Sequence, residues 1–257
     1  MKTWTALGQA VAVVGTILCS AGAFGEHADT CAVPGYLLFG DSSLDRAHAE
    51  VRKDNALQIL ALGGTSSTLP GPDGASFAYP ARLEAALTRR LPGVKVTVTS
   101  VTKTRQTAKE MLTSIAQLLL DHKPSLVILQ TGTFDAVRGT DPEDFRASVA
   151  EGVEKLQAGG ADVVLVNMQY SPRTESIVAV GAYADAIRWV SREREVPVFD
   201  RLAIMRHWYD NGQFDLYKAT KDLQMAKSVH DCLGRALAAT IIDAARLQDR
   251  EGGSAPK

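Results

Sequence analysis

The sequence predicts a doubly wound α/β domain built on a parallel sheet. Short apolar runs alternate with amphipathic stretches at a spacing of about 20–30 residues, which is typical of right-handed βαβ units. The 257 residues are 46% apolar and 22% charged, an ordinary balance for a globular chain that buries a core. No Pro/Ser-rich linker or internal repeat divides the sequence, so we expect one domain over residues 24–250, followed by a polar tail at 251–257.

The first half of the pattern begins with an apolar strand at 56–62, after a loop-like start. A helix is predicted over 80–91 because a proline stands in its first turn. Residues 94–101 alternate valine with polar residues, which is the period of a half-buried strand. Residues 106–122 carry an apolar stripe at helical spacing and are predicted as one helix.

The second half repeats the alternation of strands and helices. A Gly159-Gly160 pair marks the end of its first helix. The predicted strands are 126–129, 162–166 and 196–199, and the predicted helices are 142–158, 183–194 and 226–247.

Charge and cysteine content exclude several classes of function. The chain has 28 basic and 29 acidic residues, a net charge of −1, without the basic surface that binding to nucleic acid requires. None of the three cysteines forms a C-x-x-C pair, and no histidines stand at metal-ligand spacing, so we expect no metal and no cofactor.

The N-terminus reads as a secretory signal peptide over residues 1–23. Lys2 precedes an apolar stretch at 10–18, and Ala21-Gly22-Ala23 supplies small residues for cleavage. A stretch this short does not span a bilayer, which takes about 20 residues. We therefore expect a periplasmic or secreted protein that begins near Phe24 and has no stable membrane span after cleavage.

Export leaves two cysteines, Cys31 near one end and Cys232 near the other. An oxidising compartment favours a disulfide between them. The alternative is two unrelated buried thiols.

The ligand site of a doubly wound sheet lies beyond the carboxyl ends of its strands. This rule selects the loops at 63–76, 102–106, 130–138 and 167–173. The first contains Gly63-Gly64-Thr65-Ser66-Ser67-Thr68, a serine in a glycine turn directly after a strand, which is how α/β hydrolases expose a nucleophile. Hydroxyl groups that cap backbone donors in a turn are the alternative.

Several segments in order resemble the SGNH/GDSL hydrolase family, in particular an exported, rhizobial-type branch of it. They are LGGTSS at 62–67, YPARLEAAL at 79–87, QTAKEML at 106–112, PSLVILQTGTFDA at 124–136, ADVVLVNMQY at 161–170, FDRLAIMRHW at 199–208 and CLGRALA at 232–238. The resemblance implies a three-layer, flavodoxin-like sheet of about five strands. It also implies hydrolysis of acyl esters by a serine nucleophile.

Ser66 is the candidate nucleophile, although Gly40-Asp41-Ser42 looks more like the motif that names the family. The order of segments favours Ser66, because the oxyanion loops should follow the serine by about 35 and 65 residues, at strand ends. Thr65 and Ser67 remain alternatives in neighbouring registers.

The resemblance places substituted residues at the other catalytic positions. Thr102 stands where a glycine N–H binds the oxyanion, and Phe134 replaces the asparagine that donates to it. Alignment of the last block puts Gln224 at the histidine position and Lys221 at the aspartate position. The substitutions predict weak or lost activity.

His230 is the candidate replacement base, with Asp231 or Asp222 to orient it; the alternative is a histidine that packs on the last helix. Two functions follow: an acyl esterase that uses Ser66 and His230, or a pseudoenzyme that binds a small acyl ester or glycan ligand. The expected pocket residues are Gly64, Thr65, Thr133, Arg138, Gln169, Tyr170 and Arg173.

Overall fold

The computed structural model describes Met1 and residues 31–217 and 223–248. Within these residues five parallel strands form one sheet, in the order β2-β1-β3-β4-β5. The strand bounds are β1 Ala56–Gly63, β2 Lys95–Thr102, β3 Leu126–Gln130, β4 Asp162–Val166 and β5 Val198–Phe199. This is the flavodoxin-like order, and the prediction of a three-layer α/β fold is confirmed.

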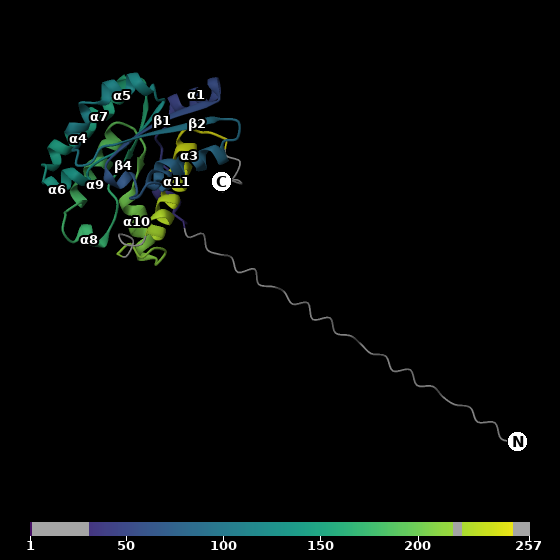
Figure 1. The fold of residues 1–257 in the computed structure, drawn as a ribbon. Helices are drawn as coiled ribbons and strands as arrows, with labels where there is room; N and C mark the ends of the chain where they lie inside the picture. The colour runs from purple at the N-terminus through teal and green to yellow at the C-terminus, as the bar shows by residue number, and fades with distance from the viewer. Residues whose placement is uncertain (2–30, 218–222, 249–257) are drawn as a thin grey trace.

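Helices cover both faces of the sheet. On one face α3 packs against α11 and β2; on the other, α7 packs against α4, α5, α9 and β4 (Figure 1). The longer helices are α1 Asp45–Asp54, α3 Tyr79–Arg90, α5 Ile115–His122, α7 Pro142–Ala158, α9 Gly181–Glu193, α10 Arg201–Asp210 and α11 Leu223–Ala244. The shorter ones are η1 Gly35–Leu37, η2 Thr65–Ser67, α2 Gly74–Phe77, α4 Ala108–Leu112, α6 Thr133–Arg138 and α8 Pro172–Glu175.

The predicted helix over 106–122 is wrong in one respect, because the structure divides it into α4 and α5. The break lies at Thr113 and Ser114. The Thr113 hydroxyl donates to the carbonyl of Glu110, and the Ser114 hydroxyl donates to the carbonyl of Met111. Hydroxyl side chains that bond to nearby backbone compete with the helical ladder, and here they end it.

Two of the longer helices lie where no helix is predicted from the sequence. Helix α1 replaces the expected loop-like start, and Ala47 is its single buried residue, so it shows no apolar stripe. Helix α10 follows β5 directly and buries Ile204, Met205 and Trp208.

A disulfide joins Cys31 to Cys232, as predicted, with their Cα atoms 5.1 Å apart. It ties the segment before α1 to the middle of α11 across 201 residues of sequence. The predicted signal peptide and the tail at 251–257 lie outside the described residues, as do Lys221 and Asp222. None of the helices in the described part combines the length and apolar character needed to cross a bilayer.

Candidate functional site

A cavity of about 510 Å³ opens at the carboxyl ends of β1 and β3. These neighbouring strands lie where the strand order reverses, the position at which open α/β sheets bind ligands. The volume falls within the range of about 300–1,000 Å³ that is usual for small-molecule sites. Ser66 and His230 both line this cavity, whereas Ser42 precedes α1 and lies outside its lining.

Ser66 is held by a tight turn that glycine makes possible. The turn η2 folds back over the end of β1, so that a Cβ at position 63 would lie only 2.0 Å from Ser67 Oγ. Because glycine carries no Cβ, the Ser67 hydroxyl fits there and donates to Gln130 Oε1 (3.0 Å). Ser66 therefore sits beside the end of β3.

Gln130 determines which hydrogen-bonding groups face the Ser66 hydroxyl. Its Oε1 accepts from Ser67 Oγ and from Arg201 Nη1 (3.2 Å), and guanidinium nitrogens only donate. That pairing orients the amide, so Gln130 Nε2 donates to Ser66 Oγ (2.7 Å). Arg201 Nη1 also lies 3.4 Å from Ser66 Oγ. The two side chains that approach Ser66 Oγ are therefore both hydrogen-bond donors.

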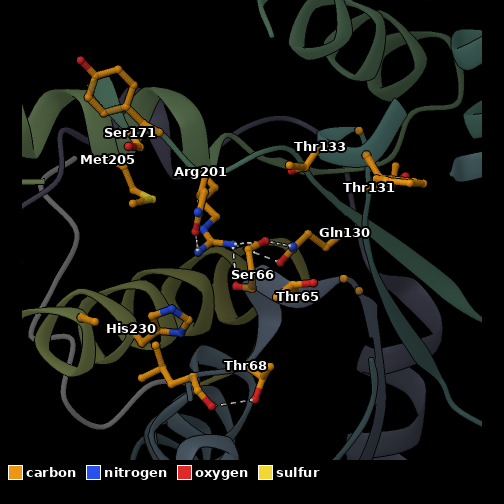
Figure 2. A pocket seen from close by; sticks show the side chains of 18 of the residues that line it. Thr65, Ser66, Thr68, Gln130, Thr131, Thr133, Ser171, Arg201, Met205 and His230 are labelled. Atoms are coloured by element: carbon orange, nitrogen blue, oxygen red, sulfur yellow. Dashed lines mark hydrogen bonds between the residues drawn. The ribbon is translucent and has the colours of Figure 1, made fainter. Parts of the chain in front are cut away.

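Arg201 is the charged centre of the site. It begins α10, is 1% exposed, and extends toward Ser66 and Gln130 in Figure 2. It also donates to the carbonyl of Ser66 (3.1 Å) and to Gln169 Oε1 (3.3 Å), and its Cζ lies 5.6 Å from the centre of the Tyr79 ring. Its Nε has no hydrogen-bond partner. Burial lowers the pKa of Arg201 to about 10, so the group remains a cation at neutral pH.

His230 faces the cavity from α11 but uses one ring nitrogen for structure. The backbone N–H of Tyr79, at the first turn of α3, donates to His230 Nδ1 (2.9 Å). The neutral imidazole therefore carries its hydrogen on Nε2. Burial, together with the positive charge of Arg201, lowers the pKa of His230 to about 3.

The two candidate catalytic residues are near each other without being bonded. In the described residues no hydrogen bond joins Ser66 Oγ to either nitrogen of His230. Asp231, the candidate orienting residue, instead pairs with Arg235 one turn along α11 (3.2 Å). In the described residues the hydrogen bonds of a Ser66–His230–Asp231 arrangement are therefore not formed.

The two oxyanion positions differ in their surroundings. Phe134 lines the cavity, and its ring packs against the guanidinium of Arg138. Thr102 ends β2 outside the lining, and the next backbone N–H, that of Lys103, donates to the carbonyl of Gly63.

The buried Asp135, next to Phe134 in sequence, accepts a hydrogen bond from the N–H of Ala108 at the start of α4. Burial raises the pKa of Asp135.

The expected pocket residues divide into two groups. Gly64, Thr65, Thr133, Gln169 and Tyr170 line the cavity.

Arg138, Arg173 and Gln224 lie outside the lining, which corrects the expectation that both arginines border it. Arg138 is drawn away by Glu110 (3.9 Å), and Arg173 lies over the ring of Tyr217, 5.0 Å from its centre. Gln224 is exposed on the first turn of α11.

Sequence reasoning missed Gln130, Thr131 and Arg201. Gln130 ends the apolar run Leu126–Gln130, and Arg201 follows β5 by two positions, so the strand-end rule pointed to both places. The signal available was a polar residue at the end of each apolar strand.

No group of three or more His, Cys, Asp or Glu in the described part of the chain is arranged to hold a metal ion.

The fold and the serine at the end of β1 define a class: three-layer α/β proteins of the SGNH esterase type. The chain belongs to the non-GDSL lipase-like family, whose sequence model matches residues 30–247.

Two curated relatives match part of the chain. Esterase TesA of Pseudomonas aeruginosa is 29% identical over 117 residues, 46% of this chain and 57% of the relative. An arylesterase of Vibrio mimicus is 27% identical over 106 residues, 39% of this chain and 53% of the relative. The matches thus span little more than half the length of each relative.

Solved structures share the fold at low identity. A catalytic mutant of Axe2, an acetylxylan esterase from Geobacillus stearothermophilus, superposes with a TM-score of 0.58 at 16% identity, over 72% of this chain and 94% of that one. LAE5, an α/β hydrolase enzyme from the metagenome of Lake Arreo, gives 0.58 at 19% identity, over 74% and 97%.

Proposed function

We propose that this member of the SGNH-type esterase family binds a small acyl or glycan ligand in the cavity and hydrolyses esters slowly or not at all. The observation that carries the proposal is the hydrogen bonding around Ser66 and His230. Ser66 Oγ is approached by two donors, and His230 Nδ1 already accepts the N–H of Tyr79.

A serine nucleophile must transfer its proton to a base as it attacks. Gln130 Nε2 and the Arg201 guanidinium cannot accept that proton. His230 would have to accept it on Nε2, which already carries a hydrogen, or on Nδ1, which would break the bond to Tyr79. The lowered pKa of His230 supports the same conclusion.

The oxyanion position supports the proposal independently. Phe134 carries no donor, and loss of one oxyanion donor typically costs about 10²–10³ in kcat. Loss of a base that acts as a unit with its nucleophile costs up to about 10⁶. Together these factors leave little turnover.

The alternative is an active carbohydrate or lipid acyl esterase with Ser66 as nucleophile and His230 as base. One observation favours it: both side chains line the same cavity.

The initial rate of hydrolysis of p-nitrophenyl acetate separates the two functions. We expect a wild-type rate near background that Ser66→Ala and His230→Ala leave almost unchanged. Ser42→Ala is the matched control, since that serine lies outside the cavity lining. A robust wild-type rate that both cavity substitutions abolish, and the control does not, would establish the esterase.

We further propose that the protein is exported through the signal peptide at residues 1–23. The apolar stretch with its small-residue cleavage site and the Cys31–Cys232 disulfide support this proposal. Mass spectrometry of the exported protein should give an N-terminus near Phe24. Protein that retains Met1 in the periplasm or medium would contradict it.

A further inference from the structure

The charged residues that line the cavity all have the same sign. Among the described lining residues Lys103, Arg105 and Arg201 are cations, and neither aspartate nor glutamate is present. His230 adds no further positive charge, because it is neutral at ordinary pH. Low-dielectric walls focus such a field, so the cavity attracts anions.

Arg201 lacks the partner that a buried arginine normally has. Its hydrogen bonds go to neutral oxygens of Ser66, Gln130 and Gln169, and no carboxylate in the described residues pairs with it. A buried charge is costly unless an opposite charge compensates it.

A neighbouring arginine shows the usual arrangement. Arg188 pairs with Asp200 (2.6 Å) and with Asp185 (2.6 Å). Asp200 precedes Arg201 in sequence, yet it bonds to Arg188, to Asn167 Nδ2 and to the N–H of Ala203. The fold therefore directs the nearest carboxylate away from Arg201.

The rest of the cavity is shaped for an apolar body. Its floor is polar, with Thr131 Oγ1 buried and without a partner. Its walls are largely aliphatic and thioether side chains: Leu69, Met111, Val137, Met205, Leu216 and Val229.

From these observations we propose that the cavity binds a monocarboxylic acid with an apolar body, whose carboxylate neutralises Arg201 on the floor. The inference rests on the proposed binding function and names its ligand class. One buried cation matches one negative charge, and the planar guanidinium suits a planar carboxylate. The exposed Lys103 and Arg105 draw the anion inward without needing to pair with it.

The test compares an acid with its neutral amide of nearly identical shape. Calorimetry should show 4-phenylbutyrate binding roughly tenfold or more tighter than 4-phenylbutanamide, because only the acid makes charge-assisted bonds. Acetate, which lacks the apolar body, and inorganic phosphate should both bind more weakly than 4-phenylbutyrate.

Variants assign the effect to Arg201. Arg201→Met should abolish the preference for acid over amide, and Arg192→Met, an exposed arginine of α9 outside the lining, should retain it. Gln130→Glu supplies an internal carboxylate beside Arg201 and should weaken the acid at least tenfold, even if Arg201→Met fails to fold.

Equal affinity for acid and amide would overturn the anionic ligand class while leaving the binding function in place. If phosphate binds more tightly than 4-phenylbutyrate, the ligand is not a monocarboxylate. If acetate binds as tightly as 4-phenylbutyrate, the ligand needs no apolar body. Absence of binding by every probe would also overturn the inference. The ester hydrolysis assay decides the proposed function separately.

Discussion

The serine side and the histidine side of the cavity are built on different principles. On the serine side, Ser66, Gln130 and Arg201 form a network of polar side chains from three separate strand ends. On the histidine side, His230 bonds to the backbone of α3, and the disulfide is anchored two residues further along α11 at Cys232.

This difference shows how one cavity can place a serine and a histidine in its lining without a hydrogen bond between them. The serine side holds the Ser66 hydroxyl between an amide donor of Gln130 and the guanidinium of Arg201. The histidine side uses its imidazole as a helix cap: Tyr79 N–H is one of the donors at a helix start that has no partner within the helix. A base and a cap require the same lone pair, and here the cap holds it.

The largest effect on the histidine side should come from the disulfide. Replacing Cys31 and Cys232 together by serine should lower the free energy of unfolding by about 2–4 kcal/mol, because the bridge restricts the unfolded chain. Urea denaturation of oxidised wild type and the double variant measures this. An unchanged midpoint would show that the bridge contributes nothing to stability.

The next largest effect on stability is expected where α11 packs closely against α3, at Gly234. A Cβ at Gly234 would lie 2.5 Å from Arg82 Cβ and 2.7 Å from the backbone N of Leu83, so Gly234→Ala must push α11 away from α3. We expect a loss of about 1–3 kcal/mol in thermal or urea unfolding. Gly181→Ala is the control, since its added methyl meets nothing within 4 Å; equal behaviour of the two variants would refute the close contact.

The cap itself is tested with two substitutions at one position. His230→Ala leaves the N–H of Tyr79 without an acceptor, whereas the Oδ1 of asparagine can take the place of Nδ1. The alanine variant should therefore be less stable than His230→Asn by about 1–2 kcal/mol. If the two variants unfold at the same denaturant concentration, the cap is not important for stability.

The pH dependence of unfolding gives a second readout of His230. Its pKa is about 3 in the folded protein and near 6.5 when unfolded, so the unfolded chain binds more protons between these values. Its stabilising contribution is therefore complete above about pH 6.5 and falls as the pH drops toward 3, by up to about 1.4 kcal/mol per unit. His230→Asn should remove this slope, and an identical slope in both proteins would contradict a buried neutral imidazole.

The smallest effect is expected on the serine side. Ser66→Ala removes the acceptor of Gln130 Nε2 but leaves Gln130 Oε1 bonded to Arg201 and Ser67, so the network should survive. A loss of about 0.5–1 kcal/mol in urea unfolding is expected. A much larger loss would mean that the serine, and not Gln130, organises this side.

Sequence reasoning reached the fold through apolar periodicity. The strands at 162–166 and 126–129 and the helix at 142–158 agree with the structure to within a residue. It missed α1 because that helix buries almost nothing, and it missed the break before α5 because hydroxyls at 113 and 114 act locally inside an otherwise helical stripe.

The sequence by itself determined which loops meet. Parallel strands place all their carboxyl ends at one edge, so the residues that follow β1, β3, β4 and β5 must come together there. Ser66 was found in this way, and the same rule covers Gln130 and Arg201 once the strands are known. A disulfide between Cys31 and Cys232 was also within reach, because removal of the predicted signal peptide would leave only these two cysteines.

Only the tertiary structure decided what those residues do to one another. The hydrogen bond of His230 to Tyr79 joins residues 151 positions apart, and the pairing of Asp200 with Arg188 leaves its sequence neighbour Arg201 facing neutral oxygens. Hydrogen bonds depend on distances of about 3 Å and on direction, whereas periodicity fixes only the face and the end of an element. The charge of the cavity and the tautomer of its histidine follow from that geometry.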